Sequence, residues 1–283
     1  MSNISLKLSK EKIETLKTTF KEYIKSSPNE YIDTFIQKDG LTISIYKSGQ
    51  VVFQGEDAIF YGSSFIDTKF NRQAGSDEVG TGDYFGPVVV CACILEESDE
   101  DIVSRYHITD SKKMSDEQIL NIGEELMNSV KHSLLILDNA KYNDVHKTNN
   151  LNMIKAKMHN QAYLNLKTKG YNMPTACYID DFCGENNYYE YLKNEKDVYH
   201  QLVFETKAET KYPSVAVASC IARFAFLKKM EEMSDKFDMF FHKGASNEVD
   251  KDAKNFVKKY GLNRLNEVAK LHFKNTENIK KAE

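Results

Sequence analysis

Residues 75–95 read GSDEVGTGDYFGPVVVCACIL, and this stretch decides the fold. Two adjacent acids, Asp77 and Glu78, precede a glycine-rich turn and a long apolar run. A continuous apolar run is typical of a strand that is buried on both faces of a sheet. We therefore expect a strand that ends at Glu78, a tight turn and a central strand. Together they would form an antiparallel hairpin at the start of an α/β domain.

The chain after this hairpin alternates between strand and helix patterns. We expect strands over residues 133–138, 175–180 and 201–209, and helices over 115–131, 150–169, 213–233, 249–260 and 263–271. The polar tail over residues 275–283 is expected to fray. Alternating strands and helices predict an α/β domain over residues 71–283.

The first 70 residues have a different pattern and predict a separate small α+β domain, residues 1–70. An amphipathic helix is expected over residues 9–26, because apolar positions recur every three or four residues up to Ile24 and Ser9 stands at a cap position. The stretch LTISIYKSGQVVFQG, residues 41–55, alternates apolar and polar residues on both sides of KSGQ. This pattern predicts a β-hairpin with a Ser-Gly turn.

Composition narrows the class of protein without identifying it. The 283 residues are 41% hydrophobic and 28% charged, which supports a sizeable core. The net charge of −4 requires any nucleic-acid surface to be a local patch. Five cysteines without a CxxC spacing fit a reduced cytosol. Because no signal peptide or membrane span is recognisable, we expect a cytoplasmic protein with no membrane partner.

Acids stand at the carboxyl ends of three predicted strands: Asp77 with Glu78, Asp180 with Asp181, and Glu209. In an open α/β sheet, ligand sites collect beyond these strand ends. If the strands are neighbours, the acids converge, and a hard divalent cation such as Mg²⁺ or Mn²⁺ would offset their repulsion. The alternative is that each acid is an ordinary helix cap or turn residue.

Asp77 and Glu78 share one site only if the strand breaks at this point, because successive strand residues point to opposite faces. We expect Gly80 and Gly82 to supply the break by adopting positive φ angles. Backbone N–H groups around Thr81 would then be open to a ligand. Two metal ions held by acids suit phosphodiester hydrolysis, and a backbone turn against the sugar can sense a 2′-hydroxyl.

Five stretches run in order between residues 73 and 276: GSDEVGTGDYFGP, DSKKMSD, YIDDF, FETKAETKYPSVAVASCIARFAFL and KLHFKNT. Together they resemble bacterial ribonuclease HIII. The first 70 residues are similar to that family's N-terminal extension, which has a TATA-box-binding-protein-like fold. The resemblance implies an RNase H-like mixed sheet with flanking helices. It also implies an endonuclease that cuts the RNA strand of RNA–DNA hybrids and leaves 5′-phosphate and 3′-hydroxyl ends.

The resemblance assigns roles to individual residues. The family's four catalytic, metal-binding acids match Asp77, Glu78, Asp180 and Glu209. The residues in the place of the 2′-hydroxyl-sensing turn are Gly80, Thr81 and Gly82. The family often has a non-acidic residue at the position of Asp181. We therefore interpret Asp181 as a surface acid or as a support for the metal ligands.

Three lysines are candidates for contacts with nucleic acid: Lys47 at the tip of the N-terminal hairpin, Lys112 before a helix, and Lys207 beside Glu209. For Lys47 and Lys112 the alternative is an ordinary solvated charge. Lys207 stands close enough to touch either the site acids or the scissile strand. We interpret Ser219 as a packing residue and His272, a lone histidine near the C-terminus, as structural or exposed.

Two other functions stay open on the sequence. One is a metal-dependent nuclease of similar fold that cuts DNA. The other is a non-catalytic protein that binds hybrids. We expect a monomer whose partner is an RNA–DNA hybrid duplex.

Overall fold

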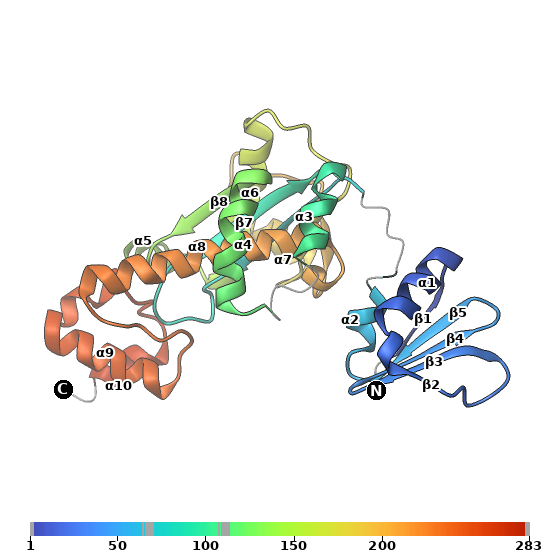
Figure 1. Cartoon of the computed structure of the whole chain (residues 1–283). Coiled ribbons are helices and arrows are strands. Elements are labelled where there is room, and N and C mark those ends of the chain that lie inside the picture. The colour runs from blue at the N-terminus through green and yellow to red at the C-terminus, as the bar shows by residue number, and fades with distance from the viewer. Residues whose placement is uncertain (1–2, 64, 66–70, 107, 109–113, 281–283) are drawn as a thin grey trace. The chain divides into compact units, whose positions relative to one another are not determined.

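The computed structural model describes residues 3–63, 65, 71–106, 108 and 114–280. The chain divides into two compact units, Met1–Lys69 and Phe70–Glu283, which we call unit 1 and unit 2 (Figure 1).

Unit 1 is an antiparallel five-stranded sheet of order β1-β5-β4-β3-β2 with two helices on one face. Its main elements are, in chain order, β1 (Asn3–Lys7), α1 (Lys10–Thr19), β2 (Ile24–Lys25), β3 (Ile32–Lys38), β4 (Leu41–Tyr46), β5 (Gln50–Gln54) and α2 (Ala58–Ser63). The predicted hairpin is confirmed as β4 and β5, which pair antiparallel. The predicted α+β character of this unit is confirmed as well.

The first helix is shorter than predicted. Ser9 caps α1 as expected, because its hydroxyl accepts a hydrogen bond from the backbone N–H of Lys12 at 3.3 Å. The helix ends at Thr19, and Ile24 lies in β2 with 42% of its surface exposed. The apolar spacing therefore extends past the true end of the helix. Leu16 and Phe20 already provide the contacts of this segment with the core.

The two faces of the unit 1 sheet differ. Ile43 and Ile45 of β4 are buried in a core that also contains residues of α1 and α2. Thr42 and Tyr46 alternate with them along the strand and stay partly exposed, as does Val52 of β5. One face of the sheet therefore holds the core, and the other presents partly exposed side chains.

Unit 2 is built on a mixed five-stranded sheet of order β10-β9-β6-β7-β8. Its strands are β6 (Gln73–Val79), β7 (Val88–Leu95), β8 (Lys131–Leu137), β9 (Cys177–Asp180) and β10 (Val203–Glu205). Strands β6, β9 and β10 are parallel, and β7 is antiparallel to both of its neighbours. All eight residues of β7 are buried, so the predicted hairpin and its central strand are confirmed.

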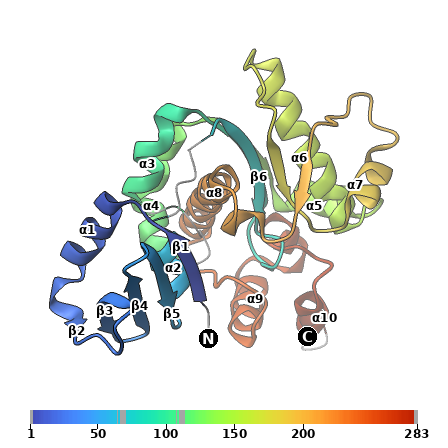
Figure 2. The same ribbon diagram turned by 90° about the vertical axis from the view of Figure 1, so that its right-hand side faces the viewer.

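Helices cover both faces of this sheet, and Figure 2 shows β6 between α6 and α8. On one face lie α6 (Leu151–Thr168) and α7 (Glu185–Leu192), and on the other α8 (Pro213–Phe237), which packs in turn against α4 (Asp116–Ser129). The remaining α-helices are α3 (Glu100–Arg105), α5 (Asn139–His146), α9 (Asn247–Tyr260) and α10 (Lys274–Lys280). The predicted mixed sheet with flanking helices is confirmed.

Three details of unit 2 position the site or correct a prediction. Gly75 of β6 lets α8 approach closely, because a Cβ there would lie 2.4 Å from the backbone nitrogen of Val215. The described part of the C-terminal tail does not fray, since residues 275–280 lie in α10, whose Ile279 is buried in the core; residues 281–283 lie outside the described residues. A helix expected over 263–271 is a 3₁₀ helix, Leu262–Glu267. In the described part of the chain, no helix is long and apolar enough to cross a membrane.

Candidate active site

The acids at the strand ends meet at one edge of the unit 2 sheet. Because β10, β9 and β6 are neighbours and parallel, their carboxyl ends lie at the same edge. Asp77 is near the end of β6, Asp180 is the last residue of β9, and Glu209 lies in a 3₁₀ turn, Ala208–Thr210, that follows β10. The predicted convergence of Asp77, Asp180 and Glu209 is therefore present in the backbone arrangement.

Asp77 faces α8. Only 7% of its surface is exposed, and it accepts hydrogen bonds from the Ser219 side chain of α8 and from the backbone N–H of Glu78, the latter at 2.8 Å. Burial, followed by the negative charge of Glu78 and more weakly of Asp180, raises the pKa of the Asp77 carboxyl well above its usual range. Ser219, which we expected only to pack, therefore touches the site.

Asp180 lies on the same face as Asp77. Ser76 pairs with Ile179 across the parallel strands, so the two following residues are level and point in the same direction. The backbone N–H of Ala208, next to Glu209, donates to Asp180 Oδ1 at 2.9 Å. Glu209 itself is buried, with 3% of its surface exposed. The α8 face of this edge therefore holds Asp77 and Asp180, and the backbone next to Glu209 is bound to Asp180.

Glu78 lies on the opposite face, which corrects the prediction that a strand break turns it toward Asp77. The strand continues through Val79, and both acids stay paired with β7. The side chain of Glu78 points toward α6, where it forms an ion pair with Lys155 and a 2.9 Å contact with Nε2 of His159. The ordinary alternation of a strand therefore overrides the expected break.

The α6 side provides a polar environment for Glu78 that the sequence analysis missed. His159 is fully buried, and its Nδ1 lies 2.8 Å from the hydroxyl of Ser76. Burial alone would raise the pKa of Glu78, but hydrogen bonds and charge from His159 and Lys155 outweigh it and hold the pKa below its usual value. The available signal was a lysine and a histidine four residues apart on the buried stripe of a helix.

The glycine turn after β6 agrees with the prediction at one position only. Gly80 has a φ of 91°, and a Cβ there would lie 2.1 Å from the carbonyl oxygen of Pro87. Gly82 does not have a positive φ, contrary to expectation, and space is open where its Cβ would be. Thr81 between them is partly exposed. The backbone of this turn is therefore accessible at Gly82.

The other candidate residues lie apart from these acids or support them. Lys207 is exposed and has a left-handed φ of 55°. Lys47 is exposed beside the β4–β5 turn of unit 1, and Lys112 lies outside the described residues. The Asp181 carboxylate accepts hydrogen bonds from two backbone N–H groups in the turn before α7, as befits a supporting acid. The ring of His272 stacks on His146 at 4.2 Å, a packing contact.

The acids fit a hard divalent cation by chemistry and position. Their oxygens suit Mg²⁺ or Mn²⁺, and burial followed by the negative charge of Glu78 raises the pKa of Asp77, a charge that a cation at this edge would offset. Within the described residues, no three His, Cys, Asp or Glu side chains are arranged as a ready-made ligand set, in keeping with the engagement of Glu78 by α6.

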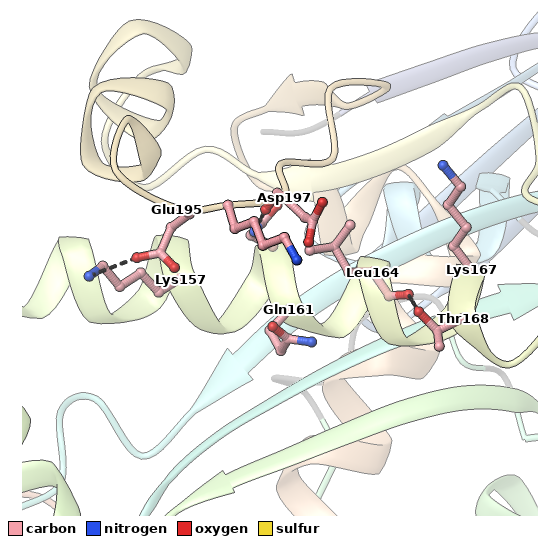
Figure 3. A pocket seen from close by; sticks show the side chains of 9 residues that line it. Lys157, Gln161, Leu164, Lys167, Thr168, Glu195 and Asp197 are labelled. Atoms are coloured by element: carbon pink, nitrogen blue, oxygen red, sulfur yellow. Dashed lines mark hydrogen bonds and ion pairs between the residues drawn. The ribbon is translucent and has the colours of Figure 1, made fainter.

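A separate hollow of about 560 Å³ lies along the outer side of α6 (Figure 3). Its lining includes Lys157, Gln161, Lys167 and Glu195, and none of the four acids. Lys157 forms an ion pair with Glu195 at 2.9 Å. This hollow is therefore not part of the candidate site.

Two family models match the chain. The model described as ribonuclease HII matches residues 74–276, and a domain of unknown function (DUF3378) matches residues 3–76. The chain is 37% identical to ribonuclease HIII of Lactococcus lactis subsp. cremoris (strain SK11), over 99% of this chain and 98% of that protein. It is 38% identical to ribonuclease HIII of Phytoplasma mali (strain AT), over 97% of each.

Solved structures agree with these relatives. The crystal structure of Bst-RNase HIII in complex with Mn²⁺ covers 99% of each chain at 30% identity, with a TM-score of 0.74. The RNase H-like fold of unit 2 and the additional antiparallel N-terminal domain of the chain are thereby confirmed. The chain belongs to the ribonuclease HIII family and is an endonuclease.

Proposed function

We propose that this enzyme hydrolyses the RNA strand of RNA–DNA hybrids and leaves 5′-phosphate and 3′-hydroxyl ends. The observation that carries the proposal is the meeting of Asp77, Asp180 and Glu209 at the carboxyl edge of three neighbouring parallel strands. The name ribonuclease HIII, carried by full-length relatives, supports the reaction class.

Asp77, Asp180 and Glu209 would hold a divalent cation, Mg²⁺ or Mn²⁺, with Glu78 as the fourth ligand. When bound, the metal supplies activation of the attacking water and stabilisation of the leaving oxygen. Glu78 can ligate only if its carboxylate exchanges part of its contact with Lys155 and His159. The Mn²⁺ complex of Bst-RNase HIII supports a divalent cation in this family.

Recognition of the sugar would fall to the turn Gly80–Thr81–Gly82. The open space at Gly82 lets a ligand approach the backbone, whose N–H and C=O groups can bind a 2′-hydroxyl. Lys207, exposed beside Glu209, would contact a phosphate of the same strand.

Unit 1 would hold the hybrid by its backbone and shape. Its sheet has one face that α1 and α2 do not cover, and Lys47 is exposed at the end of a hairpin. A sheet face with polar and aromatic side chains and a flanking cation suits contacts with sugars and phosphates. We further propose that the enzyme works as a monomer in the cytoplasm.

The test is cleavage of one labelled duplex set by the whole protein with Mg²⁺ or Mn²⁺. The set contains RNA–DNA, DNA–DNA, RNA–RNA and a DNA duplex with one ribonucleotide. We expect cleavage of the RNA strand of the hybrid and none of the all-DNA duplex. Cleavage of DNA without cleavage of the hybrid would overturn the proposal, and so would binding of the hybrid without any cleavage.

A further inference from the structure

The C-terminal segment 268–276, which we call the C-terminal strap, pairs with residues 84–86, which follow the glycine turn. Phe85 forms a β-bridge with Ala269. The backbone N–H of Lys270 donates to the carbonyl of Tyr84 at 2.8 Å, and that of Gly86 donates to the carbonyl of Val268 at 3.1 Å. Residues 84–86 and the C-terminal strap are far apart in the sequence but are thereby joined by backbone hydrogen bonds.

Lys270 is the centre of this contact. Its side chain is fully buried, and its Nζ donates hydrogen bonds to the carbonyls of Asp83, at 2.8 Å, and Gly86. Asn139 of α5 donates to the same Gly86 carbonyl at 2.8 Å. Both acceptors lie in the chain segment that joins the proposed recognition turn to β7.

A buried amine is a costly way to fill space, because transfer of a charged group from water is unfavourable without an opposite charge. Burial lowers the pKa of Lys270 to about 7. The two hydrogen bonds from Nζ to the carbonyls of Asp83 and Gly86 offset part of this cost. An apolar side chain would pack there without this cost, so the two hydrogen bonds need an explanation beyond stability.

The turn itself is anchored at both ends. Its start is fixed by β6, which ends at Val79, and its end by Lys270 through Asp83. The backbone N–H of Asp83 also closes the turn on the carbonyl of Gly80 at 3.4 Å. A change at Lys270 therefore acts on the backbone that lies between these anchors.

We propose that Lys270 is a positioning residue for substrate recognition: by holding the carbonyls of Asp83 and Gly86, it fixes the Gly80–Gly82 backbone that distinguishes a hybrid from DNA. The inference rests on the proposed function. Lys270 touches neither the acids nor the open side of the turn, so its effect is on selection of the duplex. Metal binding by the acids should be independent of it.

The test compares Lys270→Met, which keeps the length of the side chain but removes the donors, with the wild type. Affinities for an RNA–DNA hybrid and for an all-DNA duplex of the same sequence are measured by fluorescence anisotropy in EDTA. The hybrid-over-DNA preference should fall about ten-fold, the order expected from a lost buried hydrogen bond. In steady-state cleavage, KM for the hybrid should rise more than kcat falls. Calorimetric Mn²⁺ binding should be unchanged.

Asn143→Ala is the matched control. Asn143 of α5 holds the strap from its other side, donating to the Ala269 carbonyl at 2.8 Å and accepting from the Leu271 N–H at 2.9 Å. This variant should lower the melting temperature and leave the hybrid-over-DNA preference intact. If Lys270→Met does the same, Lys270 is only structural and the inference fails.

If Lys270→Met does not fold, Asn139→Ala replaces it as the test variant. Asn139, on α5, donates to the same Gly86 carbonyl as Lys270 does. An unchanged preference in a folded Asn139→Ala protein would then overturn the inference. Failure of the proposed function looks different: the wild type itself would show no preference for the hybrid. A wild type with the preference and a Lys270→Met variant that keeps it would refute the role of Lys270 alone.

Discussion

Two neighbouring residues of β6, Asp77 and Glu78, face opposite sides of one sheet and meet opposite environments. On the α8 side, Asp77 receives hydrogen bonds from the neutral Ser219 side chain and a backbone N–H, and burial and nearby negative charge raise its pKa. On the α6 side, Lys155 and His159 hold the pKa of Glu78 below its usual value despite burial. Positively charged side chains of the protein therefore compensate the charge of Glu78 but not that of Asp77.

This difference indicates where an external cation is needed. On the α6 side a lysine already provides positive charge within the fold. On the α8 side Asp180 adds a further negative charge beside Asp77. In the proposed mechanism a divalent metal supplies the positive charge there, so that metal binding and substrate cleavage share one edge of the sheet.

The largest expected effect comes from the α8 side. Asp77→Asn keeps the size of the side chain but removes the negative charge that would hold the metal. We expect cleavage of an RNA–DNA hybrid at saturating Mg²⁺ to fall by roughly a thousand-fold, the order seen when a group essential to transition-state stabilisation is lost. Single-turnover cleavage of a labelled hybrid measures this loss.

Asp181→Asn is the control for that variant. Asp181 accepts two backbone hydrogen bonds through Oδ1, which an asparagine oxygen can also accept. Its activity should stay near that of the wild type. Equal losses in both variants would contradict the distinction between Asp77 as a metal ligand and Asp181 as a supporting acid.

The α6 side should respond in stability before metal is added. Lys155→Met removes the lysine of the ion pair with Glu78, and breaking a buried ion pair costs about 3 kcal/mol or more. We therefore expect a loss of that order in the free energy of unfolding by urea, measured in EDTA at pH 7. The double variant Lys155→Met/Glu78→Gln should recover part of it.

Lys228→Met is a matched control on an exposed ion pair. Lys228 contacts Glu231 at 2.7 Å with about half of its side chain exposed. Such exposed pairs contribute little to stability. If Lys155→Met is no more destabilising than Lys228→Met, the claim that α6 compensates the charge of Glu78 is wrong.

Lys270 is a basic counterpart of Asp77, because it is also buried and forms no ion pair with any of the described residues. Its pKa is about 7 in the folded protein, against 10.5 as the ordinary value. Between these pH values the unfolded chain binds more protons, so stability should rise with pH by up to about 1.4 kcal/mol per pH unit. Below pH 7 both states are protonated and this contribution stays constant.

The free energy of unfolding by urea, measured for the wild type and Lys270→Met between pH 6 and 9, tests this dependence. This pH range brackets the lowered pKa of Lys270. The difference between the two proteins should be flat at the acid end and grow toward the alkaline end. A constant difference throughout would mean that burial does not shift Lys270 as described.

The smallest expected effect concerns Lys207 beside the acids. Lys207→Gly removes the side chain while accepting the left-handed φ of 55° without strain. Affinity for hybrid and DNA duplexes should fall together by a few-fold, with the salt dependence reduced by about one unit of slope. An unchanged salt slope would remove Lys207 from the phosphate contacts.

Much of the fold was predictable because it follows from local patterns. The apolar run of β7, the alternating hairpin of unit 1 and Pro213 at the start of α8 each specify their own structure. The acids were predictable as a group because the carboxyl ends of neighbouring parallel strands meet at one edge. These features need no knowledge of distant contacts.

The predictions are wrong where contacts with a distant part of the chain determine the local structure. Ile24 continues a helical spacing, but it lies in a strand that pairs with β3. The C-terminal tail is polar in sequence, yet Ile279 enters the core of unit 2. Glu78 keeps the ordinary alternation of β6, which stays paired with β7 through Val79, and its partners Lys155 and His159 on α6 are about eighty residues away. Sequence patterns alone did not reveal these partners.

The most direct test of the central claim is Mn²⁺ binding by isothermal titration calorimetry, without nucleic acid, to the wild type and to Asp77→Asn, Asp180→Asn and Lys270→Met. The two aspartate variants should lose Mn²⁺ binding, while Lys270→Met should bind Mn²⁺ as the wild type does. Wild-type affinity for Mn²⁺ in Asp77→Asn would contradict the claim that the acids on the α8 side hold the metal.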